Sequence, residues 1–243
     1  MNVNTVPRTL AVAAIVALAC SAMVSSAVYI LRPIQQGYAR LERNRAILAV
    51  AGRLPTGDVA DREIVARFID LEAHVVDTAT GNYATNVDAR SFDHWKTEVD
   101  PASPVHRPTL APVYLVRKDK VLERMVLPVH GRGMWSAIYG YVALDADLTT
   151  VVDIAFFRHG ETPGIGDRIQ DPAWLANWRG KRIYDESGEA RLRVVKGAQG
   201  PYEVDLISGA SVTSSATGDL VRYWFGDDGY RLFLDRLRGR EEL

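Results

Sequence analysis

The 243-residue sequence contains one cysteine, Cys20, and this residue lies within an apolar stretch near the N-terminus. A disulfide within the chain is therefore excluded, as is a metal site made of several cysteines. The five histidines are scattered and form no pair at the i, i+4 spacing of helical zinc sites. The formal net charge of -1 gives no sign of the basic surface that nucleic acid requires. We expect neither metal chemistry nor nucleic-acid binding.

The sequence also lacks the short motifs of common hydrolases. No Gly-x-Ser-x-Gly segment is present, and the single cysteine in an apolar run is no catalytic nucleophile. No Walker-type lysine follows the glycine-rich segment His159–Asp167, so nucleotide hydrolysis is not indicated. His159 and Glu161 lie two residues apart in that segment, which is weak ground for an acid–base pair. We therefore expect no independent catalytic centre.

A long uncharged segment near the N-terminus predicts a transmembrane helix. Residues Leu10–Leu31 contain no charged side chain and are flanked by Arg8 and Arg32. An α-helix needs about 20 apolar residues to cross a bilayer, whereas the apolar core of a cleaved signal peptide has about 7–15. Ala17–Cys20 resembles a lipoprotein cleavage box, but the apolar run continues beyond it. We expect residues 1–9 to precede a single retained helix, residues 10–31, in the lipid bilayer.

The charges that flank this segment leave its orientation open. Arg8 precedes the apolar run, and four arginines follow it, namely Arg32, Arg40, Arg43 and Arg45. A positive-inside count would place the C-terminal part of the chain in the cytoplasm. That count is weak for a long C-terminal domain, because such domains translocate largely regardless of charge.

Beyond Pro33 the pattern changes to that of a folded domain. Helical periodicity covers residues 35–51 and 64–71, and the prolines Pro101, Pro104 and Pro108 indicate an irregular region within 74–110. Strand-like runs follow at 113–117, 122–129, 137–144, 151–158, 191–195 and 202–207, with helical patterns at 172–178, 214–225 and 230–237. This order favours an α+β fold over a doubly wound sheet. We expect one N-terminal transmembrane helix, connecting helices and an irregular region over 32–110, and a mixed α+β domain over 111–243.

The segment Ser208–Thr217 reads SGASVTSSAT and precedes an amphipathic helical pattern. Small hydroxyl residues at such a position are typical of helix N-caps, because their oxygens accept the unpaired N–H groups of the first turn. The same geometry suits a phosphate, since the N–H groups and the helix dipole favour an anion there. Gly209 permits close backbone approach, and Asp205 is placed to orient a hydroxyl. The pattern alone favours capping and leaves phosphate binding open.

Two further segments carry residue types that suit a flat ligand. The first, His159–Asp167, reads HGETPGIGD and predicts a tight loop, with Glu161 and Thr162 as polar groups and Ile165 as an apolar one. The second, Gly131–Leu144, predicts a strand with an aromatic face that includes Trp135. From the residues alone, a structural turn and ordinary core packing are the favoured explanations of the two patterns, and ligand contact is the alternative.

Together with the apolar N-terminal segment, these motifs resemble the C subunit of the Na⁺-translocating NADH:quinone reductase. The resemblance covers nearly the whole chain and is least clear over Arg53–Arg107. It is carried by six segments: ILAVAG (Ile47–Gly52), MWSAIYGYVAL (Met134–Leu144), HGETPGIG (His159–Gly166), RVVKGA (Arg193–Ala198), SGASVT (Ser208–Thr213) and YWFGDDGYRLFL (Tyr223–Leu234). The sequence departs from the family pattern at Ser211, where threonine is usual, and at Leu206–Ile207, where glycine is usual.

The resemblance implies that FMN is held covalently by a phosphoester at Thr213, within an FMN-binding domain over residues 111–243. It implies a cofactor site that also includes Ser208, Gly209, Ala210, Ser211, Glu161, Thr162, Gly164, Ile165, Trp135 and Lys196. In the family the last threonine of this motif is the esterified residue, and Thr213 retains it. Ser211, Ser214 and Ser215 are neighbouring hydroxyls that could replace it as acceptors.

The resemblance also implies the setting in which the chain works. It indicates a single-pass protein of the bacterial inner membrane, with the C-terminal domain in the periplasm, against the arginine count. Its partners would be the other subunits of the reductase and a flavin transferase that attaches the FMN. The protein would relay electrons on the way from NADH to ubiquinone, coupled to Na⁺ export by the translocase, without being catalytic by itself.

Two other hypotheses remain open at this point. The G subunit of an Rnf-type electron-transport complex shares the ETPG segment and an SGAT-like segment, although MWSAIYGYVAL and YWFGDDGYRLFL favour the quinone reductase. The second hypothesis is a membrane-anchored assembly module without redox activity, in which SGASVT serves only as a helix cap. A flavin bound to the denatured chain would distinguish the carrier from the assembly module.

Overall fold

The computed structural model describes residues 5–57, 59–90, 92, 94 and 109–239. Two compact units make up the chain, Met1–Glu42 and Arg43–Leu243, and each is described by itself. Pro101, Pro104 and Pro108, on which the expected irregular region partly rested, lie outside the described residues.

The first unit consists of the N-terminal part of one long helix, α1 (Thr5–Val50). Its large apolar side chains are exposed, with Leu10 at 65% and Leu18 at 71%, and the helix is long and apolar enough to cross a membrane. The helix expected over 10–31 is present within α1. The prediction of a separate second helix over 35–51 was wrong, because α1 continues through these residues to Val50. Pro33 lies inside the continuous helix, where it removes one backbone hydrogen bond without ending the helix.

The second unit is built on a six-stranded sheet with the order β2-β1-β3-β4-β5-β6, in which all neighbours are antiparallel. Its strands are β1 (Glu72–Asp77), β2 (Asn82–Tyr83), β3 (Leu110–Lys118), β4 (Val121–Arg132), β5 (Ala137–Asp145) and β6 (Val151–Arg158). The last four strands confirm the expected runs at 113–117, 122–129, 137–144 and 151–158.

The strand β1 corrects the expectation of an irregular segment from residue 74 onward. The sequence of β1, EAHVVD, does not alternate between apolar and polar residues, so the pattern alone does not predict a strand. Only Val75 and Val76 of its six residues are buried. It forms because it pairs along its whole length with β3, where Val76 lies opposite Ala111. The irregular region therefore contributes two strands to the main sheet.

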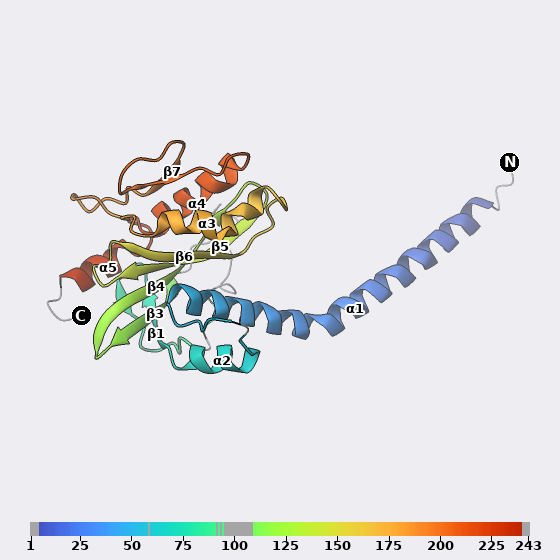
Figure 1. Cartoon of the computed structure of the whole chain (residues 1–243). Coiled ribbons are helices and arrows are strands. Elements are labelled where there is room, and N and C mark those ends of the chain that lie inside the picture. The colour runs from blue at the N-terminus through green and yellow to red at the C-terminus, as the bar shows by residue number, and fades with distance from the viewer. Residues whose placement is uncertain (1–4, 58, 91, 93, 95–108, 240–243) are drawn as a thin grey trace. The chain divides into compact units, whose positions relative to one another are not determined.

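Helices lie on both faces of the sheet (Figure 1). On one face, α2 (Asp61–Ile69) and the end of α1 pack beside a small core that includes Ile47, Val50 and Tyr141. On the other face, a larger core holds Trp178, Trp224 and Phe233. The elements of this second layer are η2 (Gly166–Gln170), α3 (Pro172–Leu175), η3 (Ala176–Trp178), β7 (Arg193–Val195), β8 (Glu203–Asp205), α4 (Ser211–Trp224) and α5 (Arg231–Arg238). An α+β domain after an apolar N-terminal helix is thus confirmed.

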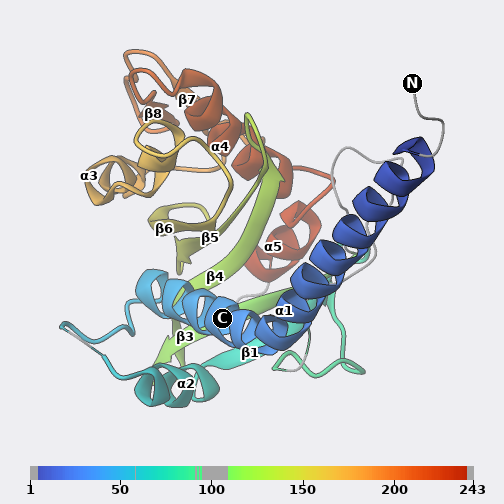
Figure 2. The ribbon, with the colours of Figure 1, turned by 90° about the vertical axis from the view of Figure 1, so that its right-hand side faces the viewer.

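The strand β4 carries the second layer, because α4 packs against it (Figure 2). Trp224, the last residue of α4, donates from its indole N–H to the His130 carbonyl at 2.6 Å. The Tyr230 hydroxyl, fully buried between α4 and α5, donates to the Pro128 carbonyl at 2.6 Å. These two bonds hold the C-terminal end of α4 to the middle of the sheet.

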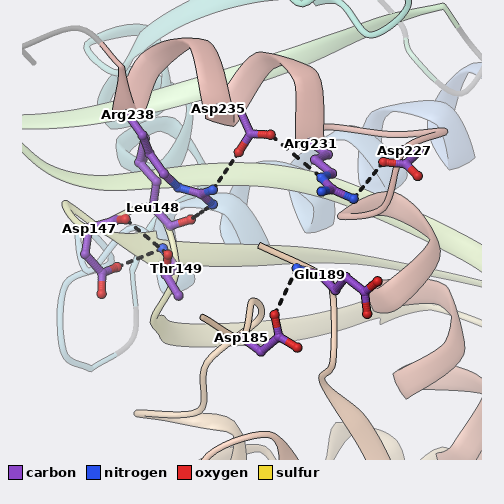
Figure 3. Close-up of polar contacts among 9 residues, drawn as sticks. All are labelled: Asp147, Leu148, Thr149, Asp185, Glu189, Asp227, Arg231, Asp235 and Arg238. Carbon is purple, nitrogen blue, oxygen red and sulfur yellow. Dashed lines mark hydrogen bonds and ion pairs between the residues drawn. The ribbon is translucent and has the colours of Figure 1, made fainter. Parts of the chain in front are cut away.

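Arg238 ties α5 to the turn between β5 and β6 (Figure 3). Arg238 donates to the Leu148 carbonyl at 2.9 Å and to Asp235 at 2.8 Å, and its guanidinium lies 4.3 Å above the Tyr184 ring. Leu148 is fully buried and has a φ of +54°, a conformation that costs a non-glycine residue free energy. The contact with Arg238 helps to retain this turn.

We expect Tyr230→Phe to lower the free energy of unfolding by about 1–3 kcal/mol, because it leaves the buried Pro128 carbonyl without its donor. Urea denaturation of the detergent-solubilised protein measures this change. Tyr202→Phe is the matched control, since Tyr202 is only half-buried and its replacement should change stability by less than about 0.5 kcal/mol. Equal stabilities of the two variants would contradict the assigned role.

Candidate functional site

Thr213 lies in the first turn of α4, which begins at Ser211 rather than at Ser214 as expected. The helix starts three residues early because Gly209 has a φ of +84° and lets the chain turn into it. The N-cap residue is Ala210, and no side chain caps this helix end. The expectation that a hydroxyl of this segment caps the helix is therefore wrong. No side chain occupies the positive end of the α4 dipole, so another group can bind there.

The neighbouring serine hydroxyls are used inside the fold or face solvent. Ser214 is fully buried, and its hydroxyl donates to the Ala210 carbonyl at 2.8 Å and accepts from the Ile207 N–H at 3.2 Å. Ser208 and Ser211 are exposed. Thr213, by contrast, is only 3% exposed and directs its hydroxyl toward a different segment.

The partner of Thr213 is Glu161, which is also buried, at 4% exposure. The Thr213 hydroxyl donates to Glu161 Oε2 at 2.6 Å, across 52 positions of sequence. The same carboxylate accepts three backbone N–H groups from the turn between β4 and β5. Met134 donates to Oε2 at 3.2 Å, and Trp135 and Ser136 donate to Oε1 at 3.0 and 3.2 Å. The carboxylate thus joins the β4–β5 turn, the His159–Asp167 loop and α4.

Two glycines leave the space that this carboxylate occupies. A Cβ at Gly133 would lie 2.5 Å from Glu161 Oε1. A Cβ at Gly166 would lie 2.8 Å from the Glu161 Cβ and 3.3 Å from the Thr213 hydroxyl oxygen. Gly166 of the expected tight loop and Gly133 of the β4–β5 turn therefore leave room for the Glu161 side chain.

Hydrogen bonding keeps Glu161 ionised at neutral pH. Burial by itself raises the pKa of Glu161, but the bonds from the Thr213 hydroxyl and from the three backbone N–H groups outweigh it. The pKa of Glu161 consequently lies below its ordinary value. The buried negative charge of Glu161 is stabilised by four hydrogen-bond donors.

Four exposed apolar side chains lie on the segments that meet at the buried pair, and we call them the apolar rim. They are Met134 (50% exposed), Trp135 (69%), Ile165 (50%) and Val212 (54%). Met134 and Trp135 belong to the β4–β5 turn, Ile165 to the Glu161 loop and Val212 to α4. Exposed apolar side chains that gather near one site can serve a ligand or a partner.

The remaining expected site residues have structural roles or lie apart from the pair. The Thr162 carbonyl accepts the N–H groups of Ile165 and Gly166 at 3.2 and 2.9 Å, and Gly164, with a φ of +76°, completes that turn. The Ser208 carbonyl accepts from Arg168 at 3.3 Å. Lys196 is exposed just after β7, which packs against α4.

The hypothesis that Asp205 orients a hydroxyl is wrong. Its carboxylate instead accepts the N–H groups of Gly197 and Ala198 at 2.8 and 3.0 Å, and so shapes the turn after β7. Sequence reasoning did not identify Met134, Ser136 and Val212 as site residues. The residue types of the β4–β5 turn carry no signal for Met134 and Ser136, because these residues bind Glu161 through their backbone N–H groups.

The structure describes no group of three or more His, Cys, Asp or Glu side chains arranged for a metal ion within residues 5–57, 59–90, 92, 94 and 109–239. The three backbone N–H groups and the hydroxyl around Glu161 are directed at its carboxylate. The end of α4 without a side-chain cap suits an anionic group, and the apolar rim suits an apolar one.

Glu161→Gln should destabilise the protein by about 1–3 kcal/mol at pH 7, because it replaces an acceptor with an amide that cannot satisfy all four donors. A lowered pKa stabilises the fold above the ordinary value of 4.5, and this contribution is lost as the pH falls through the folded-state pKa. The difference between wild type and Glu161→Gln should therefore shrink from pH 7 to pH 3. Urea denaturation across this range measures it, with the exposed Glu186→Gln as control. A constant difference would contradict the assignment.

Comparison with known proteins places this arrangement in a family. The family model for an FMN-binding domain matches residues 133–226, which include both the Glu161 loop and Thr213. The C subunit of the Na⁺-translocating NADH-quinone reductase of Pseudomonas aeruginosa is 37% identical, with 99% of each chain covered. The corresponding protein of Yersinia pestis is 35% identical, covering 98% of this chain and 95% of its own.

Solved structures show the same fold. The crystal structure of NqrC from Shewanella oneidensis superposes with a TM-score of 0.74 at 30% identity, covering 83% of this chain and all of that one. The C subunit of the Na⁺-translocating NADH-quinone reductase from Parabacteroides distasonis superposes with a TM-score of 0.65 at 28% identity, covering 84% and 96%. The chain therefore belongs to the family formed by the C subunits of Na⁺-translocating NADH-quinone reductases.

Proposed function

We propose that this chain is the electron-carrying C subunit of a Na⁺-pumping NADH:quinone reductase, with FMN esterified through its phosphate to Thr213. The observation that carries the proposal is the placement of Thr213 in the first turn of α4, at a helix end that no side chain caps. A phosphate attached there would meet N–H donors and the positive end of the helix dipole. The match to an FMN-binding domain over residues 133–226 supports it.

The residues around Thr213 divide into a phosphate side and a ring side. Ser208, Gly209, Ala210 and Ser211 form the approach to α4 and would surround the phosphate. The exposed Lys196 after β7 would supply a cation. On the ring side, Trp135 and Ile165 of the apolar rim would contact the isoalloxazine, since flat aromatic rings pack on exposed apolar side chains. Thr162 and Gly164 would shape the turn beside it.

In this assignment the protein supplies placement, and the cofactor supplies the redox chemistry. When bound, FMN provides reversible electron transfer through its isoalloxazine ring, and an ester through the phosphate leaves that ring unmodified. The first turn of α4 would hold the phosphate, and the apolar rim would shield the ring from water. The covalent bond prevents loss of the cofactor, which suits a relay that passes electrons between protein partners.

The maturation and partners of the protein follow from the same proposal. A flavin transferase would attach the FMN, and the other subunits of the membrane reductase would donate and accept its electrons on the way to ubiquinone. The apolar helix α1 would anchor the chain in the inner membrane, with no charged residue in Leu10–Leu31 to provide an ion path. Na⁺ export would then depend on the other subunits.

The relatives named above favour the quinone reductase over the Rnf-type G subunit. A non-redox assembly module is the remaining alternative, and it required the SGASVT segment to act as a side-chain helix cap. Because Ala210 caps α4 without any side-chain bond, that function of the segment has lost its support.

We expect Thr213→Ala to abolish covalent flavin, because no hydroxyl then remains at the proposed attachment point. The full chain is co-expressed with the flavin transferase, and the denatured protein is examined by ultraviolet-excited gel fluorescence and peptide mass mapping. Ser215→Ala is the matched control, since Ser215 is a hydroxyl two residues away that donates to the Val212 carbonyl, and its removal should leave the band intact. A band that survives in Thr213→Ala would assign the ester to a neighbouring serine, and no band in the wild type would refute the carrier.

The C-terminal domain is expected on the periplasmic side. The only cysteine, Cys20, is replaced by serine, and the exposed Glu186 is changed to cysteine as a reporter. A membrane-impermeant maleimide added to intact spheroplasts should label this Glu186→Cys variant as fully as it does after lysis. Labelling only after lysis would place the domain in the cytoplasm, and the Cys20→Ser protein alone gives the background.

A further inference from the structure

The hydroxyl groups near the start of α4 differ in what they donate to, and this difference bears on which of them reacts. Ser214 donates to the Ala210 carbonyl, Ser215 to the Val212 carbonyl and Thr217 to the Ser214 carbonyl. Among the hydroxyls of residues 208–217, all within the described chain, Thr213 alone donates to a carboxylate.

We propose that Glu161 positions the Thr213 hydroxyl and accepts its proton when the ester to FMN is formed. This inference rests on the proposed function, and it adds the residue that makes Thr213 the nucleophile. A hydroxyl is a weak nucleophile until an adjacent base takes its proton. Glu161 Oε2 lies 2.6 Å from the Thr213 oxygen, within the distance that such a proton transfer requires.

The carboxylate is held in place by the backbone and not by mobile side chains. The three N–H groups of Met134, Trp135 and Ser136 bind both of its oxygens at 3.0–3.2 Å. Gly133 and Gly166 leave room for it that a Cβ would fill. The hydroxyl proton of Thr213 is therefore directed at a fixed Oε2, and the oxygen lone pairs are left for the incoming phosphorus.

The step balances when the flavin donor is a phosphoanhydride, as in a flavin dinucleotide. A Thr213 Oγ1–P bond forms at the FMN phosphate, and the bond from that phosphorus to the bridging oxygen breaks. The leaving nucleotide phosphate takes the electron pair, and the hydroxyl proton passes to Glu161 Oε2. Because the pKa of Glu161 is lowered, the carboxyl group then returns this proton to solvent at neutral pH.

Burial sets a condition on this reaction. Thr213 and Glu161 are 3% and 4% exposed, so the donor can reach the hydroxyl only if covering residues move aside. Gly166 is one of the residues beside it, since a Cβ there would lie 3.3 Å from the Thr213 hydroxyl oxygen. Glu161 precedes the turn Thr162–Gly166 and is bound to the β4–β5 turn by three N–H groups. It can therefore stay in place as the base while the rest of the loop opens.

The test measures initial rates of flavin attachment to the purified full chain, with the flavin transferase and flavin adenine dinucleotide supplied. Attached flavin is followed on denaturing gels and by peptide mass at Thr213, from pH 6 to pH 9. Glu161→Gln should lower the rate by about 100-fold at neutral pH, the contribution of a general base. This deficit should shrink as the pH rises, because hydroxide replaces the missing base.

Glu203→Gln is the matched control, since the Glu203 carboxylate also accepts a backbone N–H, from Gln199 at 2.8 Å, but binds no hydroxyl. Its rate should stay within about twofold of wild type at every pH. If Glu161→Gln fails to fold, as judged by thermal unfolding, Glu161→Asp replaces it. This variant keeps the charge but withdraws the carboxylate, and it should be about tenfold slower with the wild-type pH profile.

Three outcomes separate the two proposals. Wild-type rates in Glu161→Gln or in Glu161→Asp, with the label still at Thr213, would overturn the role of Glu161 alone. A deficit in Glu161→Gln that is the same at all pH values would also overturn it, because a merely structural role produces that result. A wild-type chain that takes up no flavin, or takes it up elsewhere, would refute the proposed function itself.

Discussion

The arrangement of the site depends on one buried carboxylate. A charge removed from water is costly unless hydrogen bonds replace its hydration, and Glu161 receives four. Three come from backbone N–H groups of one turn and the fourth from the Thr213 hydroxyl of α4. Because these donors belong to segments far apart in sequence, satisfying the carboxylate requires the β4–β5 turn, the Glu161 loop and α4 to come together. The geometry around Thr213 is therefore a consequence of neutralising Glu161.

The same sheet strand fixes α4 at both ends. At the N-terminal end, the turn that follows β4 binds the carboxylate to which Thr213 donates, and at the C-terminal end Trp224 donates to the His130 carbonyl of β4. A helix held in this way cannot slide or rotate without breaking a buried hydrogen bond, which costs about 1–3 kcal/mol for each group left unpaired. The fixed helix suits a cofactor whose distance to its electron partners must stay constant.

Solvent exposure separates the two functional surfaces of the chain. The apolar side chains of Leu10–Leu31 are exposed over the whole helix and match a lipid environment, while those of the apolar rim are confined to the surroundings of Thr213. Composition and length are therefore sufficient for the N-terminal helix to suit a membrane. The rim needs three segments of the fold to be assembled before it exists.

The sequence by itself determined the parts of this protein that depend on local pattern. An uncharged run of apolar residues was enough for the membrane helix, and runs rich in β-branched and aromatic residues were enough for β3 to β6, because both signals arise from neighbouring residues. The motifs were also sufficient to indicate the family, and Thr213 stays a prediction from them. Only the tertiary structure decided that Pro33 stays within α1, that β1 joins the sheet, and that Ala210 and not a hydroxyl caps α4. It also decided the contact between Glu161 and Thr213, since a bond between residues 52 positions apart depends on where the β4–β5 turn directs its N–H groups.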